Sequence, residues 1–108
     1  MVLVVPWFLE REYRQHRMLD PEGLPETFEA WQAAALAWAE RDASAAGRRL
    51  VRVLIHPAEV ETWARELGRQ VDDRARVDFA EMLWRADVDR WRAGAATAYR
   101  RGSPSVRT

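Results

Sequence analysis

The chain of 108 residues contains no cysteine, no lysine and no asparagine. Without cysteine it has no disulfide, no thiolate nucleophile and no cysteine-based zinc site. Its two histidines, His16 and His56, do not match any metal-ligand spacing, and its five glycines are scattered instead of forming a phosphate-binding loop. We therefore expect no metal, no cofactor and no nucleotide site of the P-loop or Rossmann kind.

Long apolar runs are also missing. No stretch approaches the 18 or more residues that a membrane-spanning helix needs, and the N-terminal segment lacks the basic and apolar regions of a secretion signal. We expect a cytoplasmic protein that makes no membrane contact. Its length suits one domain, which we place at residues 1–101, followed by a flexible basic tail at residues 102–108.

The formal net charge is zero, but the charges are unevenly distributed. Residues 1–89 hold 12 arginines and all 17 acidic residues, a net charge of −5, whereas residues 90–108 hold five arginines and no acid. An acidic body is therefore followed by a basic C-terminal segment.

Two short β-branched runs, residues 2–5 and 50–55, predict strands. Each precedes a proline, Pro6 or Pro57, that can open a helix, because the first helical position needs no N–H. Apolar periodicity predicts two further helices, one starting near Pro25 and one capped by Asp72 or Asp73. The last helix is apolar on two faces in its middle, which indicates a central position or an interface.

The predicted fold is α+β in the order β-α-α-β-α-α, with four helices and a short two-stranded sheet. Because "VLIHPAEVE" at residues 53–61 echoes "VLVVPWFLE" at residues 2–10, the sequence also indicates two pseudo-repeated βαα units, from duplication or from convergent patterning. If each short connection reverses the chain, the strands pair antiparallel. We also expect the tryptophans of both halves to face a common interior.

A two-stranded sheet leaves two open edges, which a small protein covers with helices or with a second copy of itself. Together with the two-faced last helix and six tryptophans, this favours a homodimer, and extension of the sheet across the pair is one way to form it.

Two classes of residue are candidates for function. His56, at the end of the second predicted strand, is a candidate general base, although no second catalytic group is near it in the sequence; a capping or ion-paired role is the alternative. His16 is expected to be a hydrogen-bonded core residue. The candidate partner-binding residues are aromatic, apolar or basic and come from the last helix and its end: Phe79, Met82, Arg90, Trp91, Arg92, Tyr99, Arg100 and Arg101.

These features predict a non-enzymatic protein-binding or regulatory module that acts by macromolecular docking. One alternative is a phage or mobile-element protein that inhibits a host nucleic-acid-binding complex, its acidic face substituting for phosphates. Another is a nucleic-acid-binding accessory protein that uses the arginine-rich C-terminal segment. A protein partner is favoured over nucleic acid because the acidic body repels a polyanion.

Overall fold

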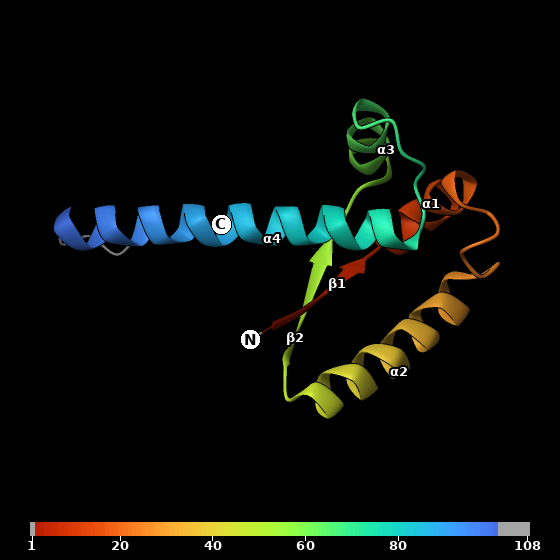
Figure 1. Cartoon of the computed structure of the whole chain (residues 1–108), viewed down its shortest axis with the longest axis horizontal. Coiled ribbons are helices and arrows are strands. Elements are labelled where there is room, and N and C mark those ends of the chain that lie inside the picture. Colours follow the sequence, from red (N-terminus) through yellow and green to blue (C-terminus); the bar gives the residue numbers. More distant parts are fainter. Residues whose placement is uncertain (1, 102–108) are drawn as a thin grey trace.

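The computed structural model describes the backbone of residues 2–101 and the side chains as far as residue 93. Within that range two strands, a short 3₁₀ turn and four helices follow one another (Figure 1). They are β1 (Val2–Trp7), the turn (Glu10–Glu12), α1 (Tyr13–Leu19), α2 (Phe28–Ala46), β2 (Arg49–Leu54), α3 (Pro57–Glu66) and α4 (Asp73–Arg101). The predicted α+β class and element order are confirmed, whereas the predicted tail at residues 102–108 lies outside the described residues.

The predicted antiparallel pairing is wrong. β1 and β2 are parallel, with Val2 opposite Arg49 and Trp7 opposite Leu54. The prediction assumed that both helices between the strands run the length of the sheet, but α1 has only seven residues and packs against α3 instead. Only α2 returns along the sheet, so it acts as the crossover that a parallel pair requires (Figure 1).

The two long helices cover opposite faces of the sheet. On one face Leu3 and Val5 pack against Ala39 and Ala43 of α2. On the other face the core that contains Val4 also contains residues of α4, namely Phe79 and Ala80. The sheet is therefore the middle layer of three, as parallel strands with buried faces require.

Pro6 does not open a helix, as the sequence had suggested, but lies within β1. The Ile55 N–H donates to the Trp7 carbonyl at 3.0 Å, so the Trp7 peptide faces β2. Alternate residues of a strand direct their peptide groups to opposite edges, so the Pro6 nitrogen faces the outer edge of β1. Its missing N–H there removes no hydrogen bond from the ladder, which is why proline is tolerated on edge strands.

Local signals fix most helix ends. The Thr27 hydroxyl caps α2 by accepting the N–H of Ala30 at 3.1 Å, and Gly47 ends α2 with a φ of 66°. Gly68 follows α3 with a φ of 67°, a conformation that glycine adopts without steric cost. Asp72 caps α4, as predicted, because its carboxylate accepts the N–H of Ala75 at 2.8 Å.

The tryptophans do not share one interior. Trp31 is 8% exposed and its ring centroid lies 4.8 Å from that of Trp7 and 4.4 Å from that of Phe8. Trp38 and Trp91, in contrast, are 48% and 53% exposed, so the prediction is wrong for these two. Trp91 is exposed because α4 continues well beyond the sheet (Figure 1).

The cap of α2 gives a first prediction. Thr27→Ala removes the acceptor for the first turn of the crossover helix, so we expect the free energy of unfolding to fall by about 1 kcal/mol in urea denaturation. Thr62→Ala is the matched control, because Thr62 is an exposed residue inside α3. Equal losses for both variants would show that the cap does not stabilise the fold.

Candidate functional site

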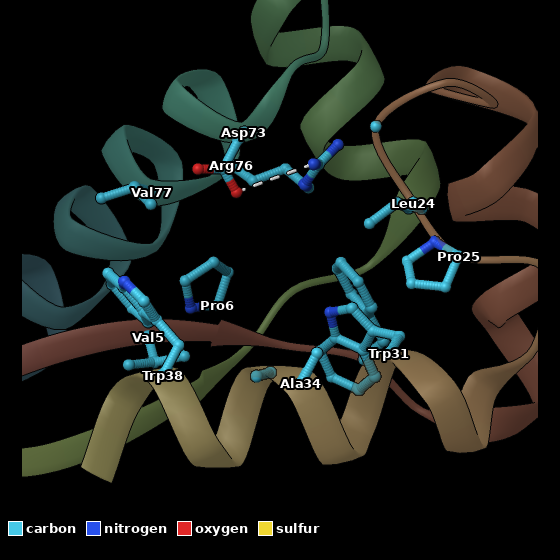
Figure 2. Close-up of a pocket in the computed structure, with 13 residues that line it drawn as sticks. Val5, Pro6, Leu24, Pro25, Trp31, Ala34, Trp38, Asp73, Arg76 and Val77 are labelled. Carbon is cyan, nitrogen blue, oxygen red and sulfur yellow. Dashed lines mark ion pairs between the residues drawn. The ribbon is translucent and has the colours of Figure 1, made fainter. Parts of the chain in front are cut away.

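A groove of about 380 Å³ runs beside the outer edge of β1, between α2 and α4 (Figure 2). Figure 2 shows β1 passing between the two helices, with Trp31 and Trp38 on the α2 side and Val77 on the α4 side. The groove exists because α2 and α4 cover the faces of the sheet but not this edge. The residues that line it are mostly apolar: Val5, Pro6, Phe8, Gly23, Leu24, Pro25, Trp31, Ala34, Ala35, Trp38, Asp73, Arg76 and Val77.

The backbone of β1 contributes hydrogen-bonding groups to this edge. Because the Trp7 peptide faces β2, the peptide groups of Val2, Val4 and Pro6 face the outer edge of β1, and of these three residues Pro6 lines the groove. An edge strand presents such groups to any extended chain laid beside it. Pro6 supplies no donor, so the N–H of Val4 is the strand donor on this edge that lies nearest to the groove in sequence.

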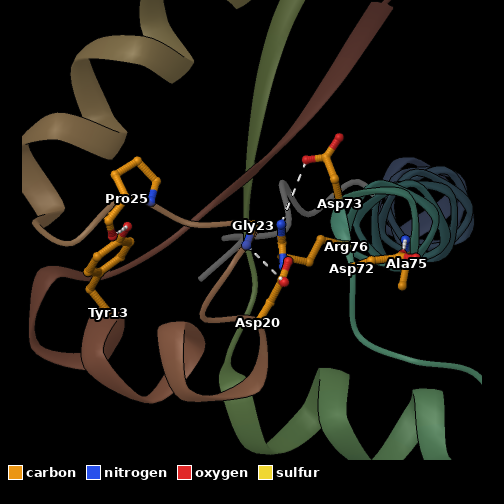
Figure 3. Close-up of polar contacts among 8 residues, drawn as sticks. All are labelled: Tyr13, Asp20, Gly23, Pro25, Asp72, Asp73, Ala75 and Arg76. Atoms are coloured by element: carbon orange, nitrogen blue, oxygen red, sulfur yellow. Dashed lines mark hydrogen bonds and ion pairs between the residues drawn. The ribbon is translucent and has the colours of Figure 1, made fainter.

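A buried arginine, Arg76, lines the groove and forms ion pairs that Figure 3 shows. Arg76 is 2% exposed, and its Nη1 donates to Oδ2 of Asp20 at 2.8 Å. Its Nη2 lies 3.8 Å from Oδ1 of Asp73, a carboxylate that is otherwise exposed. The guanidinium charge is thus already neutralised by carboxylates of this chain. No sequence pattern indicates the pair with Asp20, because the partners are 56 residues apart.

Gly23 holds the Asp20 carboxylate in place. Its N–H donates to Oδ1 of Asp20 at 3.1 Å, which closes a turn of the kind that aspartate favours. A Cβ at position 23 would lie 2.6 Å from Cγ of Asp20, so the turn requires glycine. The sequence "DPEG" is typical of a turn, but nothing in it indicates a contact with Arg76.

The two histidines have separate roles. His16 is 1% exposed, stacks on Phe8 at 4.1 Å between ring centroids, and has its Nε2 3.2 Å from the Ile55 carbonyl, which confirms the predicted hydrogen-bonded core position. Burial lowers the pKa of His16 to about 4. His56 precedes α3 and its Nδ1 lies 2.8 Å from Oε1 of Glu12, a partner 44 residues away that sequence reasoning missed.

The predicted partner-binding residues whose side chains the structure describes do not form one surface. Phe79 is 4% exposed and packs against Trp63, so it is part of the core. Met82 is 40% exposed, while Trp91 and the arginines beside it lie on the part of α4 that leaves the body. Three of the predicted residues lie where no side chains are described: Tyr99, Arg100 and Arg101.

Two further hollows lie on helix surfaces. One, of about 520 Å³, is bordered by α1 and the start of α2, and the other, of about 530 Å³, lies between α3 and α4. Neither includes a residue of β1 or β2 in its lining. The groove beside β1 is therefore the stronger candidate, because it combines apolar walls with backbone groups of a strand edge.

No model of a known protein family, no curated protein and no solved structure matches the chain. Among the described residues, no three or more metal-ligating side chains lie close enough together to hold a metal ion. None of the helices, as far as they are described, is long and apolar enough to cross a membrane.

The Arg76–Asp20 pair gives a second prediction. Arg76→Met leaves the largely buried Asp20 carboxylate without its partner, so we expect the free energy of unfolding to fall by about 3 kcal/mol. Arg74→Met is the matched control on the same helix, since the Arg74 side chain is 78% exposed. Its loss should stay within about 0.5 kcal/mol. Similar losses for the two variants in urea denaturation would contradict the structural role of Arg76.

His16 gives a third prediction, on pH. Since the pKa of His16 is lowered from 6.5 to about 4 in the folded chain, the unfolded chain binds a proton between these values that the folded chain does not. The contribution of neutral His16 to the free energy of unfolding therefore decreases as the pH falls from 6.5 to about 4, by roughly 3 kcal/mol in all.

Denaturation at pH 7, 5.5 and 4 measures this effect as the difference between the wild type and His16→Gln, which retains a donor for the Ile55 carbonyl. The difference should shift in favour of the variant as the pH falls. A difference in unfolding free energy between the wild type and His16→Gln that stays constant from pH 7 to pH 4 would disprove the lowered pKa of His16.

Proposed function

We propose that this protein is a non-enzymatic protein-binding module that holds a short extended segment of a partner protein in the groove beside β1. The observation that carries the proposal is the open edge of β1 at the base of an apolar groove. Main-chain hydrogen bonds from such an edge provide affinity, and pockets for alternate side chains provide specificity.

The chemistry of the groove favours a polypeptide over a charged ligand. Arg76 is already paired with Asp20 and Asp73, so it offers no free positive charge for a phosphate or a carboxylate. Trp31, Trp38 and Val77 offer apolar surface on both sides of the strand. An extended segment with apolar side chains at successive positions matches this arrangement, because successive side chains point alternately toward the two walls.

Pro6 limits how the segment pairs. A carbonyl of the partner placed opposite the Pro6 nitrogen would have no donor, so the favoured register places a carbonyl opposite the Val4 N–H. Because Pro6 lacks an N–H, it also hinders pairing of β1 with a long strand of arbitrary sequence. The module should therefore bind segments of a few residues in one preferred register.

The two alternatives that involve nucleic acid stay predictions: an inhibitor of a host nucleic-acid-binding complex, and a nucleic-acid-binding accessory protein. Arg90 and Arg92 are exposed on α4, away from the residues that line the groove. Binding of nucleic acid there would be compatible with the groove's use by a protein.

Selection from a peptide library displayed on phage tests the proposal, followed by affinity measurement on the selected peptides. Ala34→Glu places a charge in the groove, so we expect it to weaken binding by at least about tenfold. Ala33→Glu is the matched control, because residue 33 is an equally exposed alanine of α2 that does not line the groove. It should leave the affinity within about twofold.

Hydrogen exchange supplies a second measurement on the wild-type chain. The Val4 amide should become protected when a selected peptide is added, since it is the donor on the outer edge of β1 that lies nearest to the groove in sequence. Selected peptides that bind Ala34→Glu as well as the wild type, or that leave the Val4 amide unprotected, would refute the proposal.

A further inference from the structure

The hollow of about 530 Å³ between α3 and α4 is a second surface with an apolar floor, and α3 lies beside the first part of α4 (Figure 1). We call it the α3–α4 hollow. Its lining extends along most of α3, and α4 contributes two residues: Ala58, Glu59, Thr62, Trp63, Glu66, Phe79 and Leu83. The floor consists of Trp63, Phe79 and Leu83, which are partly or fully buried, while Glu59 and Glu66 are exposed beside it.

The largest side chain of the floor is already held in place. The ring centroid of Trp63 lies 5.2 Å from that of Phe79, and the Arg69 guanidinium lies over the Trp63 ring at 5.2 Å from its centroid. Arg69 in turn donates to Oδ2 of Asp78 at 3.1 Å. Trp63 therefore loses little conformational freedom when a partner covers it, which favours binding.

The apolar floor continues along α4. Met82 follows Phe79 by three positions and precedes Leu83, so these three residues share one side of the helix. Met82 is 40% exposed. A flexible methionine at the border of an apolar surface adapts to the shape of a partner.

The charges of the α3–α4 hollow indicate the chemistry of its occupant. Neither Glu59 nor Glu66 forms an ion pair with another described residue. None of the described residues that line the hollow is basic, and the positive charge of Arg69 is paired with Asp78. Two unpaired carboxylates repel nucleic acid and anionic lipid, whereas they attract a basic protein surface.

The backbone around the α3–α4 hollow favours a helical occupant over an extended one. Both walls are helices, whose main-chain groups bond mostly within the helix, and no residue of the described strands lines the hollow. An extended segment would place main-chain groups without partners against Trp63 and Leu83, which costs free energy. A helix satisfies its own main chain and packs its side chains against the floor.

The two glutamates set the spacing of the occupant's charges. Glu59 and Glu66 are seven positions apart, which is two turns or about 10 Å along α3. A helix laid along α3 repeats this spacing when its basic residues stand at positions i and i+7. Its apolar residues at i+3 and i+4 then face the floor beside Trp63.

We propose that the α3–α4 hollow binds one amphipathic helix of a partner protein. The apolar side of that helix covers Trp63, Phe79 and Leu83. Two of its arginine or lysine residues, seven positions apart, pair with Glu59 and Glu66, and their aliphatic stems cover the edge of the floor.

This interaction is independent of the groove beside β1. The two surfaces share no lining residue, and they select different occupants, a basic helix here and an extended apolar segment there. Failure of one proposal therefore leaves the other standing.

A library of helices displayed on a folded helical scaffold, with one exposed side randomised, tests the proposal by selection on the wild-type chain. We expect the selected helices to carry arginine or lysine at two positions seven apart, with apolar residues between them. Fluorescence anisotropy of labelled selected helices then measures the dissociation constants for the variants below.

Charge reversal tests the pairing. The double variant Glu59→Arg, Glu66→Arg should weaken binding of the selected helices by at least about tenfold. Helices whose two basic residues are replaced by glutamate should bind this variant more tightly than they bind the wild type. The control, Glu40→Arg with Glu61→Arg, makes the same change in net charge at two exposed helical glutamates outside the hollow. It should change the affinity by less than about threefold.

A bulky side chain tests the location without a change in charge. Ala58 is an exposed residue that lines the hollow, so Ala58→Trp should fill part of it and weaken binding by at least about tenfold. Ala33→Trp is the matched control at an exposed alanine of α2 outside the hollow, and its effect should stay within about twofold. Circular dichroism verifies that all variants remain folded.

Four outcomes would overturn the proposal: no helix is selected, the selected helices lack the two basic residues, the two double variants have equal effects, or Ala58→Trp binds as tightly as the wild type. Selected helices that no longer bind Ala34→Glu would also overturn it, because they occupy the groove beside β1. So would a chain that sediments as a dimer by itself and becomes monomeric in Ala58→Trp, since a second copy would then cover the hollow.

Discussion

A parallel sheet of two strands needs cover on both faces, and the rest of this structure depends on that constraint. α2 and α4 meet it from opposite sides. Two helices cannot also cover the edges, so β1 is bordered by a groove and β2 is more exposed than β1 at most positions. Each edge is protected from unselective pairing by its sequence: Pro6 removes a donor from β1, and Arg52 places a charge on β2.

Local chemistry predicted the elements but not their directions. Pro57, Gly68 and Asp72 mark helix ends because their effects act within one turn of the backbone. The direction of β2 depends instead on how far α1 extends, and a seven-residue helix that packs against α3 gives no return along the sheet. Apolar periodicity does not indicate which helix will span the sheet, and therefore the number of chain reversals could not be counted from the sequence.

The site was less predictable still. Glu12 with His56 and Asp20 with Arg76 join residues 44 and 56 positions apart, and charged residues are too numerous for sequence to select these pairs. Helical spacing placed Trp38 and Trp91 with the core, because periodicity identifies an apolar side of a helix but not where the body beneath it ends. Residues of β1, α2 and α4 line the groove together, so the sequence of any one of these elements does not predict it.

The parallel register also sets an order of events during synthesis. β1 precedes the other described elements in the chain, yet its partner strand is complete only at Leu54 and its second cover only when Phe79 and Ala80 have followed. Most of an apolar strand is therefore without its native contacts while some seventy further residues leave the ribosome. Long-range pairing of this kind slows folding, so the residues of β1 stay open to contacts with other apolar surfaces until α4 has been made.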